Sequence, residues 1–104
     1  TWDKPSFACL ASRFVYGERI TAEKLVAVDK AEQLLWELGF KQFRVRVHGS
    51  LARVELLSEQ LEQAVAEPMR STIYKGLKAA GFAYVALDLQ GYRTGSMNET
   101  LKQD

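Results

Sequence analysis

The stretch around the only cysteine of the chain offers groups that could do chemistry. Cys9 is followed by Ser12 and Arg13, so one short segment carries a thiol, a hydroxyl and a guanidinium. A nearby guanidinium favours the thiolate, which is the nucleophilic form of cysteine, whereas a buried cysteine that only packs is the common alternative. One cysteine and one histidine, His48, cannot by themselves build an ordinary zinc site or an iron-sulfur cluster.

A second group of polar residues alternates with apolar ones between residues 43 and 56. Arg44, Arg46 and His48 are expected on one face of a strand, because side chains alternate sides with a period of two. Arg53 and Glu55 of the following run are expected beside them. Clustered guanidiniums suit a phosphate or a carboxylate. A solvated face on which Glu55 offsets one charge is the alternative interpretation.

Two further positions could take part in binding. Glu32 lies at the edge of the apolar stripe of a predicted helix, where a carboxylate more often extends to solvent. It could instead face a cation, either a hairpin arginine or a metal held together with phosphate oxygens. Arg93 stands in a loop over residues 91–98 that could wrap an anion with backbone N–H groups or be an ordinary polar turn. The chain has no Gly-Lys-Ser phosphate loop, so we do not expect it to hydrolyse ATP alone.

The hydrophobic pattern predicts the elements that must position these residues. A helix is expected from its cap, Thr21, to its stop, Gly39. The remaining elements are a hairpin, a short helix, a second long helix and a buried strand, at residues 43–56, 58–65, 68–80 and 84–87. The same helix-glycine-phenylalanine-strand junction is expected at residues 38–40 and 80–82. The order α-β-β-α-α-β predicts an α+β two-layer domain, with helices packed on one face of a small mixed sheet.

Composition places the chain among ordinary globular domains. It has 104 residues, 47% hydrophobic and 26% charged, with a net charge of +1. That balance argues against a nucleic-acid or membrane-surface binder driven by bulk charge. No segment reads as a signal peptide or a membrane span, so a cytoplasmic location is expected. We expect residues 1–104 to be one domain of a longer chain, with an N-terminal segment (1–20) carrying Cys9 and a core (21–104).

Five parts of the chain form a joint pattern over nearly its whole length: residues 1–5 together with 9–14, then 16–21, 43–46, 51–55 and 91–99. Together they resemble the C-terminal domain of the LarE family, ATP-dependent sacrificial sulfur transferases of the PP-loop superfamily. The resemblance implies that the nucleotide-binding loop absent from this chain belongs to an N-terminal PP-loop domain. That domain would bind ATP and magnesium, while residues 1–104 would hold no cofactor alone and be inactive in isolation.

The resemblance further implies a role in making the nickel-pincer nucleotide cofactor of lactate racemase. A carboxylate of a pyridinium bis(carboxylic acid) mononucleotide is adenylylated, and a cysteine thiolate displaces AMP. Carbon-sulfur cleavage then leaves the sulfur on the substrate and dehydroalanine in the protein. Carried onto this sequence, Cys9 is the sulfur donor, and Glu32 assists a metal or the elimination step. The residues expected to hold the substrate phosphate or AMP are Ser12, Arg13, Arg44 and Arg46, with Arg93 as a further candidate.

Two other functions remain open. In the first, the domain is an assembly module that makes the parent protein a homo-oligomer, and Cys9 only packs. In the second, the protein is a tRNA-thiolating relative in which Arg44, Arg46 and Arg53 face RNA, against which the near-zero net charge counts. Relatives with extra cysteines use an iron-sulfur cluster instead of a sacrificial thiol, a variant that the lone Cys9 disfavours. The expected partners are the N-terminal domain, the mononucleotide and further copies of the chain, with no membrane.

Overall fold

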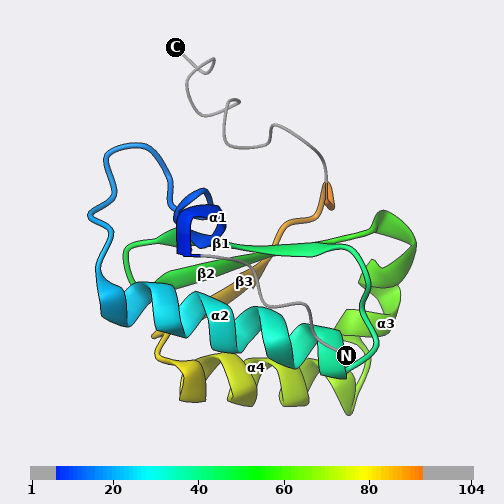
Figure 1. Ribbon diagram of the computed structural model, residues 1–104. Coiled ribbons are helices and arrows are strands. Elements are labelled where there is room, and N and C mark those ends of the chain that lie inside the picture. Colours follow the sequence, from blue (N-terminus) through cyan, green and yellow to red (C-terminus); the bar gives the residue numbers. More distant parts are fainter. Residues whose placement is uncertain (1–6, 93–104) are drawn as a thin grey trace.

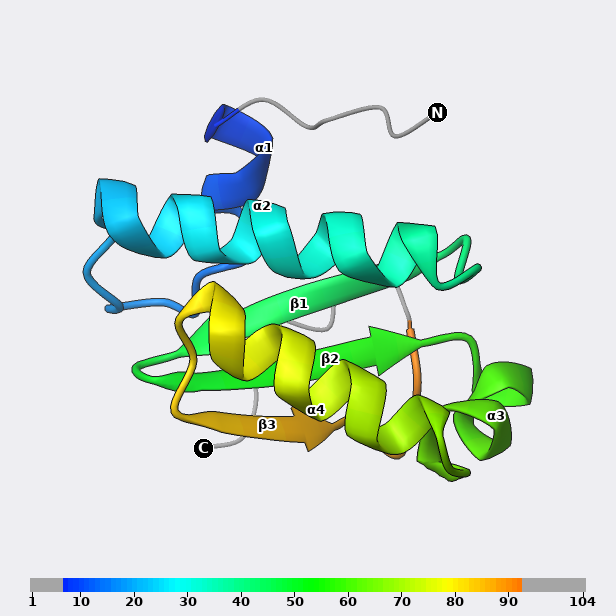
Figure 2. The same cartoon turned by 90° about the horizontal axis from the view of Figure 1, so that it is seen from below.

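The computed structural model describes residues 7–92, which form helices packed against a three-stranded sheet (Figures 1 and 2). The strand order is β1-β2-β3, with β1 antiparallel and β3 parallel to the central strand β2. Helices α2 and α4 cover one face of the sheet, which confirms the predicted α+β two-layer architecture. The elements follow in the order α1 (Phe7–Ala11), α2 (Ala22–Glu37), β1 (Phe43–His48), β2 (Leu51–Leu56), η1 (Ser58–Gln60), α3 (Leu61–Val65), α4 (Met69–Ala80) and β3 (Tyr84–Leu87).

Helix α2 begins and ends where its sequence signals predict. The Thr21 hydroxyl oxygen accepts a hydrogen bond from the backbone N–H of Lys24 at 3.2 Å, which satisfies one of the donors left over at a helix start. At the other end Gly39 adopts a left-handed backbone with φ of 102°, a conformation that glycine reaches without steric cost. The predicted cap and stop are both confirmed.

The two predicted helix-glycine-phenylalanine-strand junctions have the same geometry. Gly39 and Gly81 both have positive φ, and the following phenylalanine N–H donates to a carbonyl near the helix end: Phe40 to Leu35 at 3.1 Å and Phe82 to Leu77 at 3.3 Å. Both phenylalanine side chains are buried. Each junction therefore ends a helix and places an aromatic ring in the core with one turn.

The core lies between the sheet and the two long helices. Alternate residues of β1 and β2 point into it, as the period of a strand requires. Complete burial of an aliphatic side chain contributes about 1.5–3 kcal/mol, so this layer is the main source of stability. Its sheet residues are Phe43, Val45, Val47, Ala52, Val54 and Leu56, and its helix residues are Ala27, Val28, Ala31, Leu35, Ile73 and Leu77.

The prediction of a buried strand at residues 84–87 was wrong in its burial. Strand β3 is present, but Tyr84 is 65% exposed and Val85 to Leu87 are half-buried. In the described part of the chain β3 pairs only with β2, so it is an edge strand of a short sheet. An apolar run alone cannot distinguish a central strand from such an edge.

The N-terminal segment, where the hydrophobic pattern predicted no element, contains a short helix. Residues 7–11 form helix α1, which lies beside α2 (Figures 1 and 2). Phe14 then forms a parallel bridge with Val47, in which the Val47 N–H donates to the Arg13 carbonyl at 2.9 Å. The chain after α1 therefore lies against the outer edge of β1. A five-residue helix is too short to show a period in the sequence.

Candidate functional site

The sheet face opposite α2 and α4 carries charged side chains from both strands of the hairpin. We call Arg44, Arg46, His48, Arg53 and Glu55 the charged face. The register places Arg44 opposite Glu55 and Arg46 opposite Arg53, as the alternation predicts. The face is not simply solvated, because Arg46 and Glu55 are buried, with 7% and 0% of their surface exposed. Buried charges require compensating partners.

An ion-pair network supplies those partners. Glu55 accepts hydrogen bonds from Arg53 Nη1 at 2.8 Å and from Arg46 Nε at 3.4 Å. Arg53 Nη1 also donates to the Asp88 carboxylate at 2.6 Å. Burial lowers the pKa of Arg46 below its ordinary value, and the neighbouring Glu55 carboxylate opposes that shift. The network therefore neutralises most of the charge on Arg46 and Arg53 within the protein.

His48 joins this network as a neutral imidazole. Its Nε2 accepts a hydrogen bond from Arg53 Nε at 3.0 Å, which requires a lone pair on that nitrogen and places the proton on Nδ1. Burial and the Arg53 charge lower the pKa of His48 from its ordinary value of 6.5, although Glu18 and Glu55 oppose the shift. Protonation of His48 would break the bond from Arg53.

The His48 environment predicts a loss of stability in mild acid. The unfolded chain binds a proton at His48 more readily than the folded chain, so stability is complete above pH 6.5 and falls as the pH decreases toward the lowered pKa. Urea denaturation between pH 7.5 and pH 5 should show this fall, and H48Q should flatten it. The pKa of Glu18 is also lowered, first by its hydrogen bond with Lys24. Its effect on stability falls in a separate pH range, below the ordinary pKa of 4.5. An equally steep fall in H48Q would contradict the assignment.

Residues 9–13 form a turn at the end of α1, which we call the Cys9 turn. Its Cys9 side chain is exposed, and several hydrogen bonds hold its backbone. The Cys9 carbonyl oxygen accepts hydrogen bonds from the Ser12 N–H at 3.1 Å, the Ser12 hydroxyl at 2.6 Å and Arg13 Nη1 at 3.1 Å. Arg46 Nη1 donates to the Ser12 carbonyl at 3.1 Å. The structure therefore brings Cys9, Ser12, Arg13 and Arg46 together, with the cysteine side of the turn open to solvent.

A buried ion pair fixes this turn to the rest of the domain. Arg13 Nε and Nη2 donate to the two carboxylate oxygens of Glu32 at 2.8 and 3.0 Å, and the Val45 N–H donates to Glu32 Oε2 at 3.0 Å. The side chains of Arg13 and Glu32 are only 8% and 1% exposed. The interpretation that Glu32 extends to solvent was wrong, and the cation it faces is Arg13 rather than a hairpin arginine.

These contacts bear on the roles predicted for Arg13 and Glu32. Both Glu32 oxygens are engaged by Arg13, and Arg13 Nη1 is engaged by the Cys9 carbonyl and the Ser12 hydroxyl. Within residues 7–92, no group of three or more histidine, cysteine, aspartate or glutamate side chains is arranged to hold a metal ion. The metal and elimination roles of Glu32, and the phosphate role of Arg13, remain predictions.

Arg44 differs from the other arginines of the charged face. Its guanidinium lies over the ring of Tyr92, 5.0 Å from the centroid, and its Nη1 donates to the Phe43 carbonyl at 2.9 Å. No carboxylate of residues 7–92 lies within ion-pair distance of Arg44, so its charge is not neutralised there. Arg93, the remaining candidate, lies outside the described residues. Sequence reasoning missed Asp88 and Tyr92, which enter the site only because the chain after β3 returns to this face.

Comparison with known proteins places the chain among relatives of mostly unknown role. No family model matches it, and no helix of the described part has the length and apolar character needed to cross a bilayer. It is 48% identical over 100 residues to an uncharacterized protein of Synechocystis sp., covering 96% of this chain and 37% of that protein. It is 30% identical over 90 residues to an uncharacterized protein of Methanocaldococcus jannaschii, covering 86% of this chain and 34% of that protein.

One relative has an informative name. The chain is 38% identical over 100 residues to the pyridinium-3,5-bisthiocarboxylic acid mononucleotide synthase of Lactiplantibacillus plantarum, covering 96% of this chain and 36% of the synthase. The chain thus spans about a third of the length of the curated relatives it matches. These matches confirm the LarE resemblance at this level: the chain is LarE-like, related over nearly its whole length to a segment of this synthase.

Proposed function

We propose that this chain is the sulfur-donating part of an ATP-dependent sulfur transferase, and that Cys9 is the donor. The observation that carries the proposal is the exposed Cys9 beside the charged face: Arg46 ties its turn to that face, and Arg13 ties the turn to Glu32 of α2. The named synthase makes a pyridinium mononucleotide with two thiocarboxylic acid groups. A protein of that kind needs a sulfur source beside an anion-binding surface, and we assign the first role to Cys9 and the second to the charged face.

The proposed chemistry uses the cysteine thiolate as a nucleophile. A carboxylate of the pyridinium mononucleotide first reacts with ATP to give an acyl adenylate and pyrophosphate. The Cys9 sulfur then attacks the acyl carbon, and the carbon-oxygen bond to AMP breaks, leaving a thioester. A base removes the α proton of Cys9, its electron pair forms the Cα–Cβ double bond, and the Cβ–S pair leaves on sulfur. The products are a thiocarboxylate, dehydroalanine at position 9 and a proton on the base.

The residues around the turn receive roles from their contacts. Arg44 retains its charge in the described structure, so we assign it the first contact with the phosphate of the substrate or of AMP. Ser12 and Arg46 lie where the turn contacts the charged face, and they would orient the same anion there. Glu32 would act through Arg13 by keeping the Cys9 carbonyl in place. Arg93 stays a further candidate for the phosphate.

The activating step belongs to the part of the protein outside this chain. We propose that an N-terminal PP-loop domain binds ATP and magnesium, forms the adenylate and delivers it to Cys9 in the cytoplasm. Holding the adenylate beside the thiol is the main contribution to rate, because it replaces an encounter in solution with a reaction inside one complex. The isolated chain would then be inactive by itself.

Intact mass spectrometry of the full-length protein that contains this chain tests the proposal. The protein is incubated with ATP, magnesium and the pyridinium bis(carboxylic acid) mononucleotide. We expect the protein to lose the mass of one hydrogen sulfide, and peptide mapping should place the loss at Cys9. An unchanged mass together with a sulfur-containing product would mean that Cys9 is not the sacrificed group, and would overturn the proposal.

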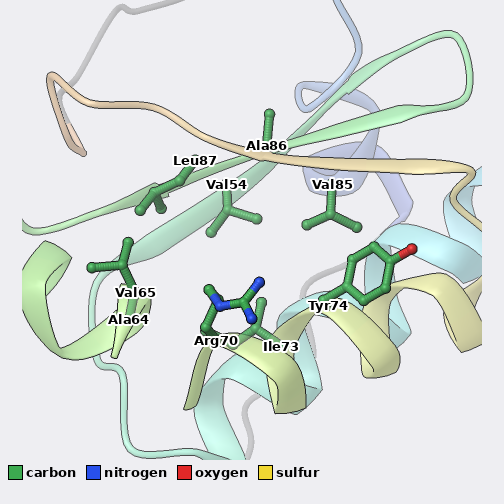
Figure 3. Close-up of a pocket in the computed structure, with 9 residues that line it drawn as sticks. All are labelled: Val54, Ala64, Val65, Arg70, Ile73, Tyr74, Val85, Ala86 and Leu87. Atoms are coloured by element: carbon green, nitrogen blue, oxygen red, sulfur yellow. The ribbon is translucent and has the colours of Figure 1, made fainter. Parts of the chain in front are cut away.

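Assembly is a second candidate function, favoured by the outer edge of β3. Its residues Tyr84–Leu87 carry no charge, and no strand of the described part pairs with this edge. A groove of about 250 Å³, lined by Ile73, Tyr74 and Val85 among others, lies beside it (Figure 3). An uncharged edge can pair antiparallel with the same edge of a second copy, giving a two-fold dimer. Sedimentation of V85K tests this: we expect smaller particles that still transfer sulfur.

The observations do not favour RNA as the ligand. Arg46 and Arg53, two of the three arginines expected to face RNA, form ion pairs with Glu55. Arg53 also pairs with Asp88. Arginines engaged in this way have less charge to offer a phosphate backbone, which depends on many such contacts for its affinity.

A further inference from the structure

The chain after β3 crosses the end of β2 at a point that only glycine can occupy. Tyr92 N–H donates to the Leu56 carbonyl at 2.5 Å, and Gly91 is buried with φ of +92°. A Cβ atom at Gly91 would lie 2.9 Å from the Leu56 carbonyl oxygen and 3.3 Å from the Ser58 nitrogen, both of them backbone atoms. This close approach fixes the position of the next residue, Tyr92, beside the charged face.

The crossing places the Tyr92 ring over the guanidinium of Arg44, with 5.0 Å between the guanidinium carbon and the ring centroid. An aromatic face attracts a guanidinium through its quadrupole, with about 0.5–2 kcal/mol depending on exposure. Unlike a carboxylate, the ring does not cancel the positive charge. Stacking uses the flat face of the guanidinium and leaves its N–H edge able to donate to an anion.

The neighbouring arginines are held in a different way. Arg13 is held by Glu32, and Arg46 and Arg53 are held by Glu55, so each is oriented by a group that also neutralises it. Within residues 7–92, Arg44 is oriented by a ring and by the Phe43 carbonyl. A binding surface for a dianion requires a cation that is fixed in place and uncompensated, and with respect to residues 7–92 Arg44 meets both conditions.

We propose that Tyr92 is a positioning residue that holds Arg44 ready to contact a nucleotide phosphate. The proposal rests on the proposed function, and deepens it by naming the group that prepares the phosphate site. The phosphate belongs either to AMP or to the pyridinium mononucleotide, since both carry a phosphate monoester that is mostly a dianion at pH 7. Tyr92 acts through Arg44 and does not itself need to touch the nucleotide.

Calorimetric titration of the full-length protein tests this, with AMP and nicotinic acid mononucleotide as separate probes. We expect Y92L to weaken binding of at least one probe about three- to ten-fold, the loss of a partly desolvated cation–π contact. Y92F keeps the ring and should bind within about two-fold of the wild-type protein. Y84L is the matched control, because Tyr84 is an exposed tyrosine of β3 that pairs with Leu51, at the opposite end of β2 from Glu55, the register partner of Arg44.

A double-mutant cycle separates positioning from a general structural effect. R44A alone should weaken binding at least as much as Y92L, and adding Y92L to R44A should cause little further loss. If Y92L does not fold, as judged by its circular dichroism melt, Y92M replaces it. A loss confined to one probe identifies which phosphate Arg44 meets. Full affinity for both probes in Y92L, or additive losses in the double variant, would overturn the proposal, as would failure of the wild-type protein to bind either probe.

This experiment is separate from the test of the donor. Binding of AMP or nicotinic acid mononucleotide needs no turnover, so it reports on Arg44 and Tyr92 whether or not Cys9 loses its sulfur. Loss of hydrogen sulfide from Cys9 with unchanged binding in Y92L would reject the positioning role and leave the proposed function standing. Weaker binding in Y92L, together with sulfur transfer that leaves the mass of Cys9 unchanged, would retain the phosphate site and reject Cys9 as the donor.

Discussion

Replacement of Cys9 by serine should abolish sulfur transfer and leave the fold intact. A serine hydroxyl could at most form an ester with the activated carboxylate, and it has no sulfur to leave behind. Because Cys9 is exposed, the substitution removes no core packing. The hydrogen bonds from Ser12 and Arg13 end on its backbone carbonyl, which C9S retains. We therefore expect a change in chemistry alone.

The measurement is the yield of thiocarboxylate per protein molecule, read beside the urea midpoint and the sedimentation coefficient. C9A serves as a second variant, because it removes the nucleophile without adding a hydroxyl. Continued sulfur transfer by C9S would mean that the sulfur has another source. Unchanged oligomer size with complete loss of transfer would reject the view that the domain serves assembly alone.

Substitution of Glu32 by alanine should destabilise the fold far more than the loss of a charge on the surface. The change leaves the buried Arg13 guanidinium without its carboxylate, and breaking one partner of a buried pair typically costs about 3–5 kcal/mol. It also removes the acceptor of the Val45 N–H. Urea denaturation followed by circular dichroism measures the change in the free energy of unfolding.

Two comparisons make this prediction specific. E67A is the matched control, since Glu67 is an exposed carboxylate whose pair with Arg70 and hydrogen bonds from Ser71 together contribute less than a buried pair. The double variant R13M/E32L removes both charges and should recover much of the stability lost in E32A, because well-packed apolar side chains often replace a buried pair without loss. If E32A is no less stable than E67A, the Arg13–Glu32 pair does not hold the turn.

The sequence predicted the elements whose signals are local. Helix α2 has a cap, a stop and a long apolar stripe within one segment, and the hairpin alternates over two neighbouring runs. Helix α1 was not predicted, since five residues contain little more than one turn. The exposure of β3 depends on which strands flank it in the sheet, and no residue of the strand itself carries that information.

The sequence predicted which residues form the site but not which of them pair with one another. Cys9, Ser12, Arg13 and Arg46 do lie together. The partner of Glu32 is 19 positions away along the chain, and an apolar stripe gives no signal of such a contact. Which arginine of the charged face keeps its charge is decided by Glu55, Asp88 and Tyr92, whose positions depend on how the sheet closes.

The hydrogen bonds of the Cys9 turn affect how much of the protein would be able to donate sulfur. The three hydrogen bonds from Ser12 and Arg13 all end on the carbonyl of residue 9, which would be retained if the proposed reaction converts the side chain to dehydroalanine. We therefore expect a spent molecule to keep these hydrogen bonds and to stay folded. Used copies would accumulate beside fresh ones and compete with them for nucleotide. Output would then follow the rate of protein synthesis, as for a reagent, and would decline as the population ages.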